Sequence, residues 1–171
     1  MGILRRVKNR ILRRKGMVSY WRSQGAKIGE GCDIHVNATL GSEPYLVEIG
    51  NHVRINTNVH ILTHDGGVWV LRGMKPEYAD ADLFAPVKIG DNVHIGTGAM
   101  IMPGVTIGSN CIIGCDAVVT HDVPTGSVAV GVPARVIKTI EAYEEKNRDR
   151  LVHTKSMTSK EKREFLTKRF R

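Results

Sequence analysis

The chain has 171 residues, a formal net charge of +8 and only 5% aromatic residues, which fits a single domain. Residues 1–29 and 135–171 together contain 21 Lys/Arg and six acidic residues, whereas residues 30–134 contain four and eleven. An acidic body excludes a nucleic-acid-binding fold, whose recognition surface is basic. The apolar runs are too short for a membrane span, and the first residues lack a secretory signal.

Residues 3–15 place apolar side chains at helical spacing, with Arg and Lys at most of the other positions. We therefore expect residues 1–25 to form a basic amphipathic N-terminal helix. Two interpretations stay open: the helix packs on the body, or it lies on an anionic membrane. The three cysteines do not indicate a disulfide framework or a zinc site, so we expect a cytoplasmic protein, at the inner face of the membrane in the second interpretation.

A branched apolar residue recurs every six residues between Val87 and Val123. The set is Ile89, Ile95, Ile101, Ile107, Ile113 and Val119. A slim residue stands two places before each of them. This period fits neither a helix nor a single strand, and it predicts an all-β fold, a parallel β-helix. Three such hexads make one triangular coil, so each branched residue should stack on the one 18 positions later, as Ile89 on Ile107.

Earlier hexads at residues 28, 34 and 40, and at 49, 55 and 61, give about four coils within residues 26–138. The spacing slips between Leu40 and Ile49, which predicts a bulge at Ser42–Pro44. A larger gap between Ile61 and Ile89 predicts that residues 62–86 leave the coil as an extruded loop. Loops of this length inside a compact fold are usually functional.

The repeat weakens after Val123. Residues 139–150 read as a helix, and Thr158 with Glu161 forms a capping box before a second helix at 159–170. Residues 139–171 are thus expected to be a basic helical C-terminal extension, either packed as a cap or frayed.

The motifs IGDNVHIG, PGVTIG and GVPARVI resemble the galactoside and maltose O-acetyltransferase group of hexapeptide-repeat acyltransferases. The segment Gly41–Asn51 and the THDGG loop are more similar to members that acetylate cell-surface polysaccharides. The resemblance implies a left-handed β-helix and a homotrimer with active sites between subunits. It also implies acetyl-CoA as donor, a sugar hydroxyl as acceptor, direct transfer and no metal.

The resemblance assigns the general base to His64 at the root of the loop, because a neutral imidazole accepts a hydroxyl proton near pH 7. Either Asp65 or a backbone carbonyl orients this ring. His94 and His35 are the rival bases.

The remaining site residues are also implied by the resemblance. Those expected to contact CoA are His94, Gly96, Thr97, Cys115, Thr120, His121, Arg135 and Lys138. Backbone N–H groups at Gly96–Thr97 are expected to stabilise the oxyanion, and Arg135 with Lys138 to meet phosphates. The acceptor is assigned to His35, Asn37 and Trp69, although Trp69 equally fits a loop anchor.

Two other functions stay open. A carbonic anhydrase of the same fold would bind a metal through His60, His64 and His94, and a scaffold without chemistry would not bind acetyl-CoA. Among acyltransferases, the sequence does not identify the acceptor.

Overall fold

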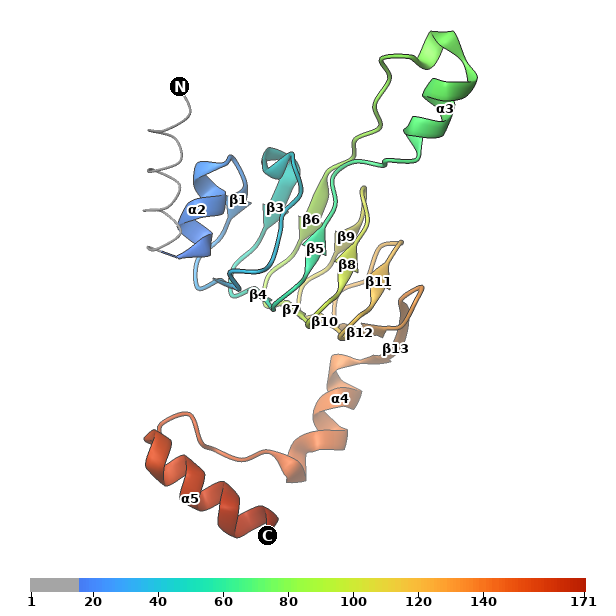
Figure 1. The fold of residues 1–171 in the computed structure, drawn as a ribbon. Helices are drawn as coiled ribbons and strands as arrows, with labels where there is room; N and C mark the ends of the chain where they lie inside the picture. The colour runs from blue at the N-terminus through green and yellow to red at the C-terminus, as the bar shows by residue number, and fades with distance from the viewer. Residues whose placement is uncertain (1–15) are drawn as a thin grey trace.

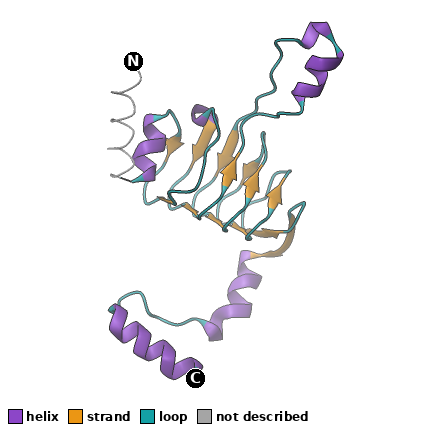
Figure 2. Cartoon of the chain, viewed as in Figure 1, coloured by secondary structure: helices purple, strands orange, loops and turns teal. Residues whose placement is uncertain are grey.

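The computed structural model describes residues 16–171, and the body of this chain is a parallel β-helix (Figure 1). Short strands stack into three sheets, and tight turns carry the chain from one sheet to the next (Figure 2). The predicted helix over residues 3–15 lies outside the described residues.

Each sheet is built from strands of successive coils. The first sheet contains β1 (Lys27–Ile28), β3 (Val47–Ile49), β6 (Val87–Ile89) and β9 (Thr106–Ile107). The second contains β2 (Asp33–Ile34), β4 (Arg54–Ile55), β7 (His94–Ile95), β10 (Ile112–Ile113), β12 (Ser127–Val130) and β13 (Arg135–Thr139). The third contains β5 (His60–Ile61), β8 (Met100–Ile101) and β11 (Val118–Val119).

The strand register confirms the stacking that the hexads predict. Ile89 pairs with Ile107, and the two later pairs follow the same 18-residue offset. The branched residues and most of their slim partners are buried in one continuous column. Because side chains alternate along a strand, both members of each hexad point inward while the residue between them faces out.

The β-helix continues past the last predicted hexad. Val123 forms a bridge to Ile107, and β12 stacks in register on β10 before β13 folds back antiparallel to it. The six-residue period did not predict this last turn, because Val123 follows Val119 by four residues instead of six.

Two corners of the β-helix position the candidate site. The second–third corner is where the chain leaves the second sheet for the third, as between β7 and β8. The third–first corner is where it leaves the third sheet for the first, as between β5 and β6. At the latter corner the chain departs from the sheets, forms α3 (Val68–Met74) and η2 (Pro76–Tyr78), and returns; Figure 1 shows this loop standing away from the coils.

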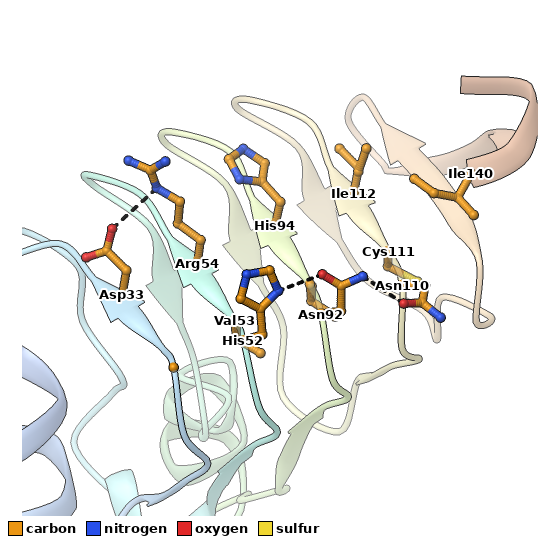
Figure 3. Close-up of a pocket in the computed structure, with 12 residues that line it drawn as sticks. Asp33, His52, Val53, Arg54, Asn92, His94, Asn110, Cys111, Ile112 and Ile140 are labelled. Atoms are coloured by element: carbon orange, nitrogen blue, oxygen red, sulfur yellow. Dashed lines mark hydrogen bonds and ion pairs between the residues drawn. The ribbon is translucent and has the colours of Figure 1, made fainter. Parts of the chain in front are cut away.

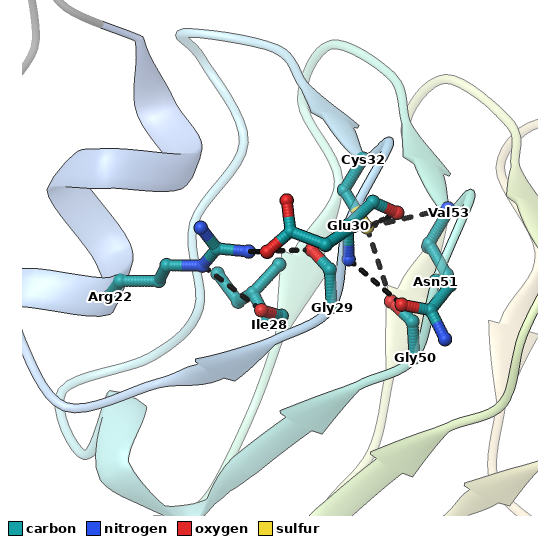
Figure 4. A network of polar contacts seen from close by, with 8 residues as sticks. All are labelled: Arg22, Ile28, Gly29, Glu30, Cys32, Gly50, Asn51 and Val53. Atoms are coloured by element: carbon teal, nitrogen blue, oxygen red, sulfur yellow. Dashed lines mark hydrogen bonds and ion pairs between the residues drawn. The ribbon is translucent and has the colours of Figure 1, made fainter.

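A short helix, α2 (Met17–Ser23), covers the first coil; it lies within the range 1–25 expected to be helical, after the periodic stretch 3–15. Its residues Met17, Tyr20 and Trp21 are buried in the same core. Arg22 donates to the carbonyl oxygens of Ile28 and Gly29, at 3.0 and 2.8 Å, and to the Glu30 carboxylate at 2.8 Å (Figure 4). Apolar burial and these bonds dock α2 on the end of the column.

The C-terminal extension is helical, as predicted. It contains α4 (Ile140–Asn147), η3 (Arg148–Arg150) and α5 (Ser159–Phe170), and the Thr158–Glu161 capping box is present. Neither helix buries a residue. Within residues 16–171, every helix is too short or too polar to cross a bilayer.

Candidate active site

His64 stands at the root of the loop, where the two limbs of the loop pair with each other. The segment Thr63–Asp65 runs antiparallel to Leu83–Ala85, with backbone hydrogen bonds of 2.9 and 3.0 Å and a bridge between His64 and Phe84. This pairing fixes the backbone of His64 at the third–first corner, although its side chain remains about half exposed.

The imidazole of His64 contacts a carboxylate that the sequence analysis did not assign. Nδ1 lies 3.3 Å from Oε2 of Glu43 and 3.2 Å from Oγ of Ser42. Thr63 and Ser42 donate to the same carboxylate oxygen at 2.8 and 2.9 Å. The ring of Phe84 meets the imidazole edge-on, with 6.2 Å between ring centroids. The ring of His64 is therefore held from two sides.

These contacts set the protonation pattern of the pair. Burial acts to raise the pKa of Glu43, but hydrogen bonds from Thr63, Ser42 and His64 outweigh it and hold the pKa below the usual 4.5. An ionised carboxylate only accepts, so Nδ1 of the neutral imidazole carries the proton and Nε2 keeps its lone pair. Nε2 has no hydrogen-bond partner among residues 16–171, so it is available to a hydroxyl.

The expected orienting role of Asp65 is corrected by this arrangement. Its carboxylate accepts from the N–H of Gly67 at 2.7 Å and shapes the start of the loop. Glu43 takes the position instead. It lies at the third–first corner one coil before His64, in the bulge that the slip in spacing predicts. That both residues lie at the same corner of successive coils was the feature of the sequence that could have indicated their contact.

The second–third corner collects a different group of predicted residues. His35 and Asn37 lie at this corner of the first coil, and the N–H of Asn37 donates to Nδ1 of His35 at 3.2 Å. Gly96 and Cys115 lie there on successive later coils, so close that a Cβ added to Gly96 would come within 2.6 Å of the Cys115 nitrogen. Acceptor and donor residues thus follow one another along this corner.

Of the two residues expected to stabilise the oxyanion, only one has a free backbone N–H group in the described part of the chain. The N–H of Gly96 donates to the carbonyl of Ile113 at 2.8 Å and belongs to the strand ladder. The N–H of Thr97 has no partner within the described part of the chain. Because an oxyanion needs a donor that is free to bind it, Thr97 is the candidate and Gly96 is not.

The remaining predicted CoA residues lie beyond the third sheet. Thr120 and His121 occupy the third–first corner of the last full coil, 2.8 Å apart between Oγ1 and Nδ1. His121 and Arg135 line one groove of about 340 Å³, and Lys138 follows on β13. Trp69 is 76% exposed on α3, away from all of these groups.

His94 lies on the outer face of β7. Burial, and next the charge of Arg54, lower its pKa below the usual 6.5, so the ring is neutral at pH 7. Residues 16–171 contain no group of three or more His, Cys, Asp or Glu side chains placed to hold an ion, as the metal alternative would require.

Comparisons with known proteins identify the family of this chain. The model for the bacterial transferase hexapeptide (six repeats) matches residues 86–121. Protein CapG of Staphylococcus aureus is 47% identical over 152 residues, which cover 88% of this chain and 87% of that protein. The galactoside O-acetyltransferase of Escherichia coli K12 is 39% identical over 125 residues, covering 69% of this chain and 57% of its own length.

Solved structures extend the likeness to complexes with acetyl-CoA and with CoA. A hexapeptide-repeat acetyltransferase of Vibrio cholerae complexed with acetyl-CoA has a TM-score of 0.58 at 29% identity, covering 67% of this chain and 60% of that one. A galactoside acetyltransferase in complex with CoA has a TM-score of 0.57 at 26% identity, covering 82% of each chain.

Stacked hexads in three parallel sheets define a hexapeptide-repeat acyltransferase with the left-handed β-helix fold. The chain belongs to the hexapeptide-repeat acetyltransferase family, and it is an enzyme that takes acetyl groups from acetyl-CoA.

Proposed function

We propose that this enzyme transfers acetyl directly from acetyl-CoA to a sugar hydroxyl, in a cell-surface polysaccharide or its precursor, with His64 as general base. The observation that carries the proposal is the Glu43–His64 pair at the root of the extruded active-site loop. It leaves Nε2 of the neutral imidazole without a proton, on a side chain that is about half exposed, as a base for an incoming hydroxyl must be. The names of relatives that act on galactosides support a sugar acceptor.

The reaction then has two steps. Nε2 of His64 takes the hydroxyl proton while the sugar oxygen bonds to the thioester carbonyl carbon, and the Thr97 N–H stabilises the oxyanion. The tetrahedral intermediate collapses, the carbon–sulfur bond breaks, and the imidazolium returns the proton to the CoA thiolate. No residue of the enzyme is acetylated.

We further propose that the active site forms between subunits of a homotrimer. The corner with His35, Thr97 and Cys115 and the corner with His64 and Thr120 lie on opposite borders of the third sheet. Acetyl-CoA can contact both groups of residues when the second–third corner of one subunit faces the third–first corner of its neighbour.

Substitution of His64 tests the proposed base. In His64→Ala, kcat on sugar acceptors should fall about 10²–10⁴-fold, the usual contribution of a general base. Affinity for acetyl-CoA, measured by calorimetry, should stay unchanged. His60→Ala is the matched control, because His60 is an exposed histidine on β5 four residues earlier. Unchanged turnover in His64→Ala would move the base to His94 or His35.

The basic N-terminal segment is proposed to bring the enzyme to an anionic membrane surface at the cytoplasmic face. Seven of residues 1–15 are Lys or Arg, and none is acidic. Each basic residue near such a surface contributes about 1 kcal/mol of attraction. The full chain should float with phosphatidylserine vesicles in a density gradient, and a chain lacking residues 1–15 should not. Equal flotation of both would contradict the proposal.

A further inference from the structure

The second sheet carries a pocket on its outer face that contains Arg54, a residue with no part in the reaction described above. It has a volume of about 410 Å³, in the lower part of the range for small-molecule sites. Asp33, Arg54, His94 and Ile112 project into it from successive strands, and Ile140 closes one end (Figure 3). A row of polar side chains next to two apolar ones is more typical of a ligand site than of a sheet face that binds nothing.

One edge of this pocket is formed by hydrogen-bonded turns of successive coils (Figure 3). Nδ1 of His52 lies 2.8 Å from Oδ1 of Asn92, whose amide nitrogen donates to Oδ1 of Asn110 at 2.8 Å. These three residues repeat at the same turn of successive coils, and all have positive φ near 55°. Each turn is therefore fixed by its neighbour, and the pocket keeps its shape before any ligand enters.

Arg54 is the cation of the pocket, and most of its donors are unused. Its Nε lies 3.4 Å from Oδ2 of Asp33, a pair in which both side chains are more than half exposed and which is therefore weak. Neither terminal nitrogen of the guanidinium has a partner within residues 16–171. Two parallel N–H groups of this kind form the fork that binds a carboxylate or phosphate.

The other cations of the acidic body are engaged elsewhere. Arg72 pairs with Asp82 in the loop, and Lys75 lies 5.7 Å from the ring centroid of Tyr78. Lys88 lies beside Glu48 on the first sheet. Among the four Lys/Arg of residues 30–134, Arg54 alone faces a pocket next to the candidate site.

His94 joins this pocket to the acceptor corner. Its Nε2 lies 3.5 Å from the amide nitrogen of Asn56, which begins the second–third corner between those of His35 and Gly96. The ring is neutral at pH 7, because burial and Arg54 lower its pKa. A sugar at this corner would thus place one of its substituents in front of the Arg54 guanidinium.

We propose that Arg54 selects an acidic acceptor by binding an anionic group of the sugar, either a carboxylate or a phosphate ester. This inference rests on the proposed sugar O-acetylation and specifies its substrate class. Arg54 acts on specificity, because it holds the acceptor and does not touch the transferred acetyl group.

The test compares acetylation of galactose, galacturonic acid and galactose 1-phosphate by the wild type and two variants of Arg54. For the wild type, kcat/KM should favour one of the acidic sugars over galactose by roughly 10- to 100-fold, the range for a charged hydrogen-bond pair. In Arg54→Gln that preference should disappear, because kcat/KM for the preferred acidic sugar falls roughly 10- to 100-fold, to the level of galactose. Arg54→Lys should retain part of the preference for the acidic sugar, since Lys binds anions but lacks the two parallel N–H groups of Arg.

Lys88→Gln is the matched control, since it removes a cation from the first sheet, outside the pocket. A wild-type preference for galactose 1-phosphate over galacturonic acid would identify the phosphate ester as the anionic group. Equal turnover of all three sugars by the wild type would overturn the role of Arg54 and leave the proposed reaction standing. A raised KM for acetyl-CoA in Arg54→Gln, with unchanged acceptor preference, would instead assign Arg54 to the donor phosphates. Failure to acetylate any of the three would overturn both proposals.

Discussion

Glu43 and His64 are 21 residues apart, yet their side chains meet because both lie at the third–first corner of successive coils. The hexad spacing predicted where each corner lies and that the chain bulges near Glu43. The spacing did not predict the contact, because it concerns the inward-facing residues and gives no information about polar side chains on the outer surface. The role of His64 as general base, in contrast, is implied by the family resemblance and stays a prediction.

Replacing Glu43 by Gln should slow catalysis without impairing donor binding. The amide keeps the size of the side chain but removes the negative charge that fixes the Nδ1–H tautomer. We expect kcat to fall roughly 10- to 100-fold, less than the full contribution of a general base, with the KM for acetyl-CoA unchanged. Asp65→Asn is the control, since its carboxylate bonds the Gly67 N–H and not the imidazole. An equal loss in both variants would contradict the assignment of Glu43.

The same substitution should change stability with pH. Because hydrogen bonds lower the pKa of Glu43, its ionised form stabilises the fold above the usual value of 4.5, and this contribution is lost as the pH falls through the lowered pKa. The difference in unfolding free energy between wild type and Glu43→Gln, from denaturant titrations, should therefore be largest near neutral pH. It should shrink below pH 4.5.

At the scale of the elements, the stacked register was predictable and the two ends of the column were not. Each coil repeats one inward pattern, so counting hexads on both sides of the bulge and of the long loop predicts the strand pairs from β1 to β11. The ends have no coil beyond them and are closed by unrelated segments. The seven-residue helix α2 and the antiparallel pair β12–β13 each occur once, so they leave no period to detect.

Trp21 tests how much α2 contributes to closing the first coil. It is 9% exposed and packs against Tyr20 with 4.9 Å between ring centroids. Trp21→Ala should cost about 3–5 kcal/mol of unfolding free energy, the range for removing a buried indole. Denaturant unfolding followed by circular dichroism measures this loss.

Trp21→Phe is the matched variant. The indole nitrogen is buried and has no hydrogen-bond partner within residues 16–171, so a ring without that N–H loses no bond. We expect Trp21→Phe to remain within about 1.5 kcal/mol of the wild type. An equally large loss in both variants would show that the indole makes an interaction beyond apolar burial.

At the scale of the whole molecule, the site residues fall into two rows that one chain does not bring together. His64 and Thr120 lie on one border of the third sheet, and Thr97 and Cys115 on the other. The resemblance assigns His64 as the base and the other three residues to the CoA groove, in active sites that it implies lie between subunits.

Mixing two inactive variants tests whether neighbouring subunits share the site. His64→Ala damages one corner, and Cys115→Trp should block the other by filling the donor groove beside an exposed cysteine. Co-refolding equal amounts of the two variants mixes their subunits at random. In a cyclic oligomer, about one quarter of the interfaces then contain an intact corner of each kind. About one quarter of the wild-type activity should therefore return. A mixture of His64→Ala with Thr120→Trp is the control, because both changes damage the same corner and no interface regains a complete site. If the first mixture is as inactive as this control, each chain builds its own active site and the trimer has no part in catalysis.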